Sequence, residues 1–230
     1  MTVTEENKTL FNQIIDKAAL KRKVYHTTFD TFNKFKTQAI KLNKEYQEHD
    51  LKVNSEIPFE FKDKGEFEFQ LKFGGDILMF VMHTNVFEFS RDHEVMKTKY
   101  IQEEKDRSYC GIINIYNFLA DSFKYNRVND IGYMIGRIFI NKDQHYFLEG
   151  KREIGLLFNN FGEEVLTEDK ISEIVNSSIQ YTLNFDLLTP PYDNVKFVTV
   201  YDMESTLQNM KISTGKRLGF RFQADHKDSE

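Results

Sequence analysis

The chain has little of several features that would direct it to a particular class of protein. Its 230 residues include one cysteine, Cys110, so no disulfide can form within the chain, as is usual in a reducing compartment. The longest apolar run, Ile77 to Met82, is too short to span a membrane. The first ten residues lack a basic stretch followed by an apolar one, so we expect no signal peptide and a cytoplasmic protein.

Tryptophan is also absent, whereas phenylalanine occurs 22 times. Phenylalanine offers a large apolar area with no polar atom to satisfy, so a phenyl-rich core is expected. Hydrophobic residues make up 40% and charged residues 29% of the chain, a balance typical of a globular protein. The net charge of -5 implies no domain-wide basic surface, which argues against nucleic acid or a membrane as the partner.

The first fifty residues carry the most informative pattern. They contain no glycine and no proline, and Thr4 followed by two glutamates is typical of a helix start. Apolar residues recur at alternating steps of three and four, the spacing of a coiled-coil seam or of a helix laid along a partner. The repeat predicts one long amphipathic helix with the interface residues Phe11, Ile14, Ala18, Tyr25, Phe32, Phe35, Ala39 and Leu42.

This helix should be longer than one small sheet can cover. At about 1.5 Å per residue it spans about 60–70 Å. Polar residues at two seam positions, Lys21 and Thr28, and extra apolar residues such as Leu10 and Phe29 widen the stripe beyond a two-stranded coil. We therefore expect part of the stripe to be buried against another chain, with packing across the chain's own sheet as the alternative.

After Pro58 the apolar period changes from about 3.5 to about 2. Residues 66–73 alternate between apolar and polar and predict a half-buried strand, which a turn at 74–76 joins to an apolar strand at 77–83. Residues 86–89 predict a third strand, and residues 133–140 and 145–149 predict a second hairpin. An antiparallel sheet follows.

The remaining segments are predicted from weaker patterns. Residues 90–108 are dense in charge and suggest a loop or a solvated helix, and the apolar spacing at 112–123 indicates a helix. Thr167 is the expected N-cap of a helix that ends near Leu183. Further strands are expected at 154–158, 195–201 and 218–222, with a short helix at 204–210.

Together these elements predict an α+β protein with a long N-terminal helix and a mainly antiparallel, Phe-rich sheet on which two or three helices pack. No tract rich in glycine, serine or proline divides the chain. We expect residues 1–50 to form the assembly or docking helix, residues 51–223 a single α+β domain, and residues 224–230 a frayed tail.

One short motif resembles a known active site. Residues 147–151 end in Glu149-Gly150-Lys151, and a Glu-x-Lys tripeptide at a strand end resembles the metal-binding half of the PD-(D/E)xK nuclease family. The resemblance covers this pentapeptide alone. It implies a divalent cation held by Glu149 and a second acid, Asp130, with Lys151 stabilising the developing charge. The alternative is a charged strand edge that discourages aggregation.

Other catalytic or ligand-binding motifs are absent from the sequence. The six histidines have neither HExxH nor Cys/His zinc spacing, and Gly74, Gly132 and Gly136 lie outside phosphate-binding loop patterns. Cys110 has no activating neighbour in the sequence. No metal or cofactor is therefore expected.

The sequence favours a non-enzymatic protein that forms a homo-oligomer or docks a protein partner through its N-terminal helix. A metal-dependent nuclease that uses Asp130, Glu149 and Lys151 is one alternative. A small-molecule sensor is another, and it would need an enclosed pocket of about 300 Å³ or more lined by phenylalanines.

Overall fold

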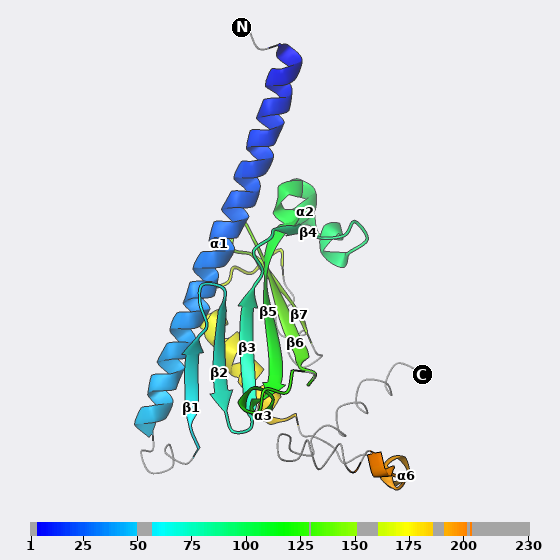
Figure 1. The fold of residues 1–230 in the computed structure, drawn as a ribbon. Helices are drawn as coiled ribbons and strands as arrows, with labels where there is room; N and C mark the ends of the chain where they lie inside the picture. Colours follow the sequence, from blue (N-terminus) through cyan, green and yellow to red (C-terminus); the bar gives the residue numbers. More distant parts are fainter. Residues whose placement is uncertain are drawn as a thin grey trace.

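The computed structural model describes residues 4–49, 57–128, 130–150, 161–185, 191–201 and 203 of the chain. An antiparallel sheet forms one layer, and two helices, α1 (Glu5–His49) and α5 (Glu168–Leu183), form a second layer on one of its faces (Figure 1). The predicted α+β class, with a long N-terminal helix and a Phe-rich antiparallel sheet, is confirmed.

α1 is a single helix of 45 residues, as its repeat and its lack of glycine and proline predict. The amide of Asn7 donates a hydrogen bond to the Thr4 hydroxyl at 3.4 Å, which caps the start of the helix. From Val24 onward the helix lies along the sheet, and Val24, Phe32 and Phe35 are fully buried. Its first third continues past the end of the sheet (Figure 1).

Seven strands form one sheet within the described residues. All neighbours are antiparallel, and a two-residue strand, β4 (Phe87–Glu88), pairs with the start of β5. The predicted hairpins at 66–83 and 133–149 are both present. The order of the other six is β1 (Phe59–Asp63), β2 (Glu68–Phe73), β3 (Asp76–Met82), β5 (Tyr109–Leu119), β6 (Tyr133–Asn141) and β7 (Tyr146–Gly150).

The main core lies between the sheet and the two helices, and phenylalanines dominate it. The rings of Phe69 and Phe80 stack with centroids 4.6 Å apart, and Phe32 of α1 lies 5.5 Å from Phe69. At Gly111 the backbone of β5 touches α1 so closely that a methyl group there would lie 2.7 Å from Thr28 Cβ. A small residue on each side therefore brings helix and strand together.

The opposite face of the sheet carries a second, smaller core. The connection from β4 to β5 forms a 3-10 helix, η1 (Glu94–Lys97), the helix α2 (Lys99–Glu103) and a second 3-10 helix, η2 (Lys105–Ser108). Val95 and Ile101 from this connection pack against Ile112 and Phe139 of the sheet. The segment 90–108, predicted as a loop or a solvated helix, is thus a series of short helices with most residues exposed, and its few buried apolar residues cover this face.

The helix predicted at 112–123 is wrong, because these residues form most of β5 followed by the short helix α3 (Ala120–Lys124). β5 lies between β3 and β6 and is buried on both faces. Ile113 and Ile115 belong to the main core, whereas Ile112 belongs to the second core. A strand covered on both sides has a nearly continuous apolar run, and helical spacing can be found in such a run by chance.

α5 agrees with the sequence at both ends. The amide of Lys170 donates a hydrogen bond to the Thr167 hydroxyl at 3.3 Å, and the helix ends at Leu183. Its buried residues include Ile171, Ile174 and Val175. α5 lies beside α1, and Gln38 Nε2 donates a hydrogen bond to the Ser172 hydroxyl at 2.9 Å.

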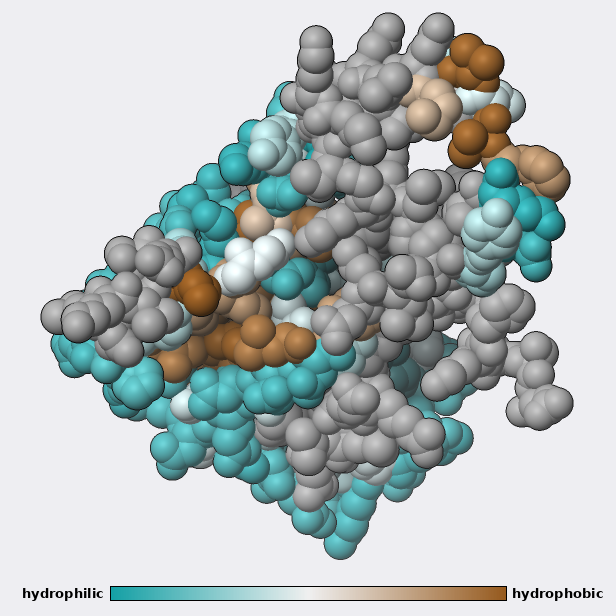
Figure 2. All heavy atoms as spheres, turned by 90° about the horizontal axis from the view of Figure 1, so that it is seen from below, coloured by the Kyte–Doolittle hydropathy of each residue, from teal (hydrophilic) through white to brown (hydrophobic). Residues whose placement is uncertain are grey.

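The strand predicted at 195–201 is also wrong. Residues 192–195 form the short helix α6 (Tyr192–Val195), and no strand occurs between residues 191 and 201. β-branched and aromatic residues favour a strand only where a neighbouring strand and a core receive them. Here Phe197 and Val200 are exposed, and hydrophobic spheres stand apart from the body on the side of α6 (Figure 2). The elements predicted at 154–158, 204–210, 218–222 and 224–230 lie outside the described residues.

Candidate functional site

The first third of α1, residues 5–19, extends past the sheet with every residue exposed; we call it the overhang. Its large apolar side chains are about half exposed, with Leu10 at 50%, Phe11 at 48%, Ile14 at 56% and Ile15 at 62%. Helical spacing of three and four places them on one side of the helix together with Ala18. These five residues form the apolar stripe of the overhang.

Polar contacts mark the place where α1 leaves the body. Lys17 Nζ donates a hydrogen bond to the Tyr109 hydroxyl and lies 3.7 Å from the centre of that ring. Lys23 Nζ lies 3.5 Å from the Asp143 carboxylate. Val24 is the first fully buried residue of the helix. The overhang therefore begins as a direct continuation of a helix that the core holds in place.

The apolar stripe is flanked mainly by basic side chains. Lys21 and Arg22 follow Ala18 by three and four residues, and Lys8 precedes Phe11 by three, so each adjoins the stripe. Lys8 also pairs with Glu5, at 2.6 Å. Over residues 1–23 there are five basic and three acidic residues, whereas the whole chain has five more acidic than basic residues. Two of the five basic residues and all three acidic ones lie within the overhang, whereas Lys21, Arg22 and Lys23 follow it, so the positive charge is concentrated at the base of the overhang next to Ala18.

A hollow of about 840 Å³ lies on the opposite face of the sheet from α1. Its apolar wall consists of Val95, Tyr100, Phe147 and Phe161, of which Val95 and Phe161 are almost completely buried. These residues come from the adjacent helices η1 and α2, from β7 and from the segment before α5, so the fold brings together three separate parts of the chain. The other lining residues are Asp92, His93, Glu94, Thr98, Lys99, Glu103, Gly162 and Glu163.

The rim of this hollow is acidic. Four carboxylates, those of Asp92, Glu94, Glu103 and Glu163, are exposed around it, against one lysine, Lys99. Asp92 accepts a hydrogen bond from the Ser90 hydroxyl, Glu94 pairs with Lys97 at 2.8 Å, and Glu103 lies 3.4 Å from Arg107 Nη1. The hollow thus combines an aromatic wall with a negatively charged mouth.

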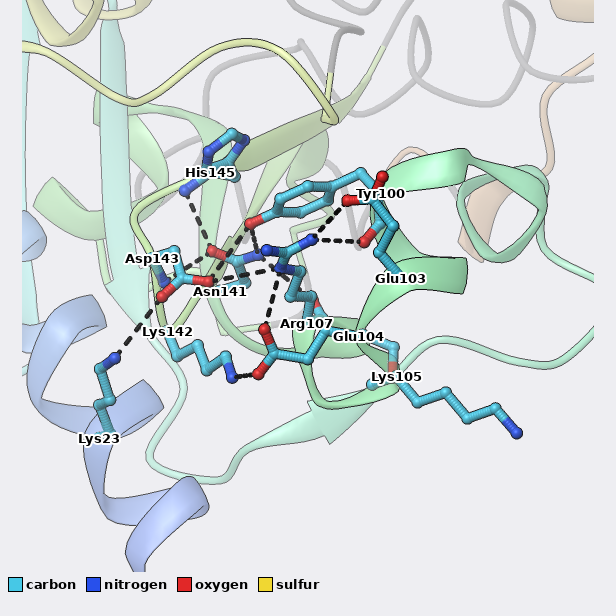
Figure 3. A network of polar contacts seen from close by, with 11 residues as sticks. Lys23, Tyr100, Glu103, Glu104, Lys105, Arg107, Asn141, Lys142, Asp143 and His145 are labelled. Carbon is cyan, nitrogen blue, oxygen red and sulfur yellow. Dashed lines mark hydrogen bonds and ion pairs between the residues drawn. The ribbon is translucent and has the colours of Figure 1, made fainter.

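A polar network connects the wall of the hollow to α1 (Figure 3). The Arg107 guanidinium lies 4.3 Å from the centre of the Tyr100 ring, and its Nη1 donates to the Tyr100 carbonyl oxygen at 2.9 Å. Asn141 Nδ2 donates to the Tyr100 hydroxyl at 3.0 Å, and the neighbouring Asp143 contacts Lys23 of α1. The position of α2, and with it one wall of the hollow, is therefore tied to the base of the overhang.

The buried titratable groups near these surfaces keep their protons. Burial raises the pKa of the Tyr100 phenol, and the nearby Asp143 carboxylate raises it further. Burial also raises the pKa of the Cys110 thiol well above its ordinary value. The neutral thiol of Cys110 is a poor nucleophile, because the thiolate is the reactive form.

The structure divides the predicted interface residues into two groups. Phe32, Phe35 and Ala39 are completely buried in the chain's own core, and Tyr25 and Leu42 pack against that core. Phe11, Ile14 and Ala18 are exposed on the overhang. Of the predicted interface residues, only Phe11, Ile14 and Ala18 are therefore available to another chain.

The residues of the nuclease hypothesis have separate partners. Asp130 lies 3.2 Å from Arg127 Nε and accepts a hydrogen bond from the Ser122 hydroxyl at 2.7 Å. Glu149 of β7 forms an ion pair with Arg137 of β6. Lys151 lies outside the described residues, so the hypothesis stays a prediction.

The structure also bears on the histidines, on metal binding and on the sensor hypothesis. His83 accepts a hydrogen bond from the Asn85 amide, and His145 is hydrogen-bonded to the Phe161 carbonyl oxygen. Within the described ranges no group of three or more His, Cys, Asp or Glu residues is arranged to hold a metal ion. The hollow is partly open to solvent, so the sensor hypothesis, which requires an enclosed pocket, stays a prediction.

Comparison with known proteins identifies no relative: no protein-family model, no curated protein and no solved structure matches this chain. No helix in the described part of the chain is long and apolar enough to cross a membrane. The functional conclusion therefore depends on the surfaces themselves.

Proposed function

We propose that this protein is a non-enzymatic assembly protein that self-associates through the overhang of α1. The observation that carries the proposal is the apolar stripe, in which four large side chains are between 48% and 62% exposed on a helix anchored in the core. Contiguous exposed apolar patches on folded proteins are characteristic of interaction sites. The stripe lies on one element, so a single contact can cover it.

Burial of the stripe is energetically favourable and requires little ordering. Removing apolar surface from water contributes roughly 25 cal/mol per Å². An isolated helix of this length would be marginal in water, but the overhang continues a helix whose other half packs on the sheet. Because the helix is already formed, the free energy of association includes no cost for ordering it.

The test is the mass of the protein in solution. Light scattering of the wild-type chain at up to about 200 µM should give a mass above the 27.3 kDa of one chain. Ile14→Glu places a charge in the middle of the stripe and should return the mass to that of one chain. Gln13→Glu adds the same charge on the other side of the helix and should leave the mass unchanged.

Two results would overturn the proposal. One is a wild-type protein that stays monomeric over the whole concentration range. The other is an Ile14→Glu variant that associates as strongly as the wild type. Circular dichroism of each variant should be unchanged, because the overhang makes few contacts with the body.

A further inference from the structure

Two surfaces of this chain have complementary character. The apolar stripe of the overhang is flanked by Lys21 and Arg22, whereas the hollow has an aromatic wall and four carboxylates at its mouth. Each surface offers what the other lacks: large apolar side chains with positive charges beside them, and an apolar cavity with negative charges around it. Complementary charge guides and orients such a contact.

The dimensions of the two surfaces also agree. Pockets that hold drug-sized molecules have volumes of about 300–1,000 Å³, so a hollow of about 840 Å³ can receive several side chains from one helical turn. Phe11 and Ile14 are three residues apart and project from the same side of the helix. They can enter the hollow together and reach its aromatic wall, which includes Phe147 and Phe161.

The overhang cannot fill the hollow of its own chain. α1 packs on the face of the sheet that contains the main core, whereas Val95, Phe147 and Phe161 belong to the core of the opposite face. The overhang continues α1 without a break and extends past the end of the sheet (Figure 1). An overhang that occupies this hollow must come from another molecule.

We propose that the overhang of one chain inserts its apolar stripe into the hollow of a second copy. This inference rests on the proposed self-association and adds the surface that receives the helix. The lysine and arginine beside the stripe then lie near Asp92 and Glu94, which are both exposed at the mouth. The contact joins two different surfaces, so each molecule has one of each to offer.

A complementation experiment tests this contact. One variant, Ile14→Glu, lacks a competent overhang and keeps the hollow. The other, Asp92→Lys with Glu94→Lys, reverses charge at the hollow and keeps the overhang. Each alone should associate at least about tenfold more weakly than the wild type, whereas an equimolar mixture should form a complex of two chains by sedimentation velocity. Glu45→Lys with Glu48→Lys, at the other end of α1, makes the same change in net charge and should associate like the wild type.

The outcomes separate this inference from the proposed function. If the hollow variant associates like the wild type while Ile14→Glu does not, the overhang mediates self-association but the hollow does not receive it. If the mixture associates no better than the two variants alone, the inference is overturned in the same way. A wild-type protein that is monomeric throughout overturns both.

Discussion

At the scale of single residues, polar side chains in the core allow close packing. Thr28 is a polar position in the apolar seam of α1, and its hydroxyl donates to the Val24 carbonyl oxygen at 2.8 Å within the same helix. Its polar group is therefore satisfied locally, and its small side chain faces Gly111 of β5. A polar residue such as Thr28 is unsuited to the seam of a coiled coil, but its small side chain allows the helix to lie close to the strand.

This contact predicts a cost for a single added methyl group. Gly111→Ala would place its Cβ 2.7 Å from Thr28 Cβ, so helix and strand must separate. Overpacking of this kind costs about 1–3 kcal/mol, measurable from the midpoint of urea unfolding. Gly136→Ala is the matched control, because its nearest atoms would be 3.6 Å away; it should cost less than about 1 kcal/mol. Equal losses of stability would contradict the close approach at Gly111.

Cys110 provides a second test at this scale. It is 1% exposed, and burial raises the pKa of its thiol well above the ordinary value. The reactive thiolate is therefore scarce and inaccessible in the folded protein. We expect no reaction with a thiol reagent such as DTNB at mildly alkaline pH until urea unfolds the chain, when one thiol should react. Rapid labelling of the native protein would show that the second core opens.

At the scale of elements, α1 combines two roles along one helix. A repeat of 3.5 residues drifts around a straight helix by about 20° per heptad, or about 60° over the three heptads between Phe32 and Phe11. The apolar side of the helix faces the sheet at Phe32 and is therefore rotated away from that direction at Phe11. The apolar stripe of the overhang is uncovered for two reasons: the sheet ends before it, and this rotation turns it away from the sheet.

The same substitution should consequently have opposite effects in the two halves of α1. Phe35→Ala removes a fully buried ring that lies 5.9 Å from Phe80 and should destabilise the fold by about 3–5 kcal/mol. Phe11→Ala should leave the unfolding midpoint nearly unchanged and weaken association. Paired measurements of denaturation and light scattering separate the two effects. A large loss of stability in Phe11→Ala would mean that the overhang supports the fold.

The elements that could be predicted from the sequence are those with one buried side. α1, β2 and α5 each carry one apolar face, and α5 also has a clear start signal in Thr167. The exception is β3, which is apolar on both faces and could be predicted because a turn joins it to β2. β5 could not be predicted, because it is apolar on both faces and its spacing also fits a helix. Its identity as a strand depends on its neighbours β3 and β6, which the local sequence does not specify.

The candidate site was predictable only in part for a related reason. The overhang follows from a repeat that can be read along the chain. The hollow joins Val95, Tyr100, Phe147 and Phe161, which are up to 66 positions apart in the sequence. Only the three-dimensional fold brings these residues together, and the charged residues between 90 and 108 conceal the apolar ones among them.

At the scale of the whole molecule, the position of the two surfaces determines the kind of assembly. The overhang and the hollow are different surfaces, so their contact is heterologous and leaves a free overhang on one chain and a free hollow on the other. A pair of overhangs in contact with each other would instead be two-fold symmetric and would stop at two chains. Mass as a function of concentration therefore distinguishes the two arrangements.

We expect the weight-average mass in analytical ultracentrifugation to rise beyond twice 27.3 kDa as concentration increases, because every added chain brings a new free surface. Excess Ile14→Glu chains should lower that mass, since each offers a hollow but no overhang and so ends the growing assembly. Raising the salt from about 0.05 M to about 0.5 M should also lower it, because the ions screen the contact between Lys21 or Arg22 and the carboxylates of the hollow. A mass that stops at two chains would instead identify contact between overhangs as the correct arrangement.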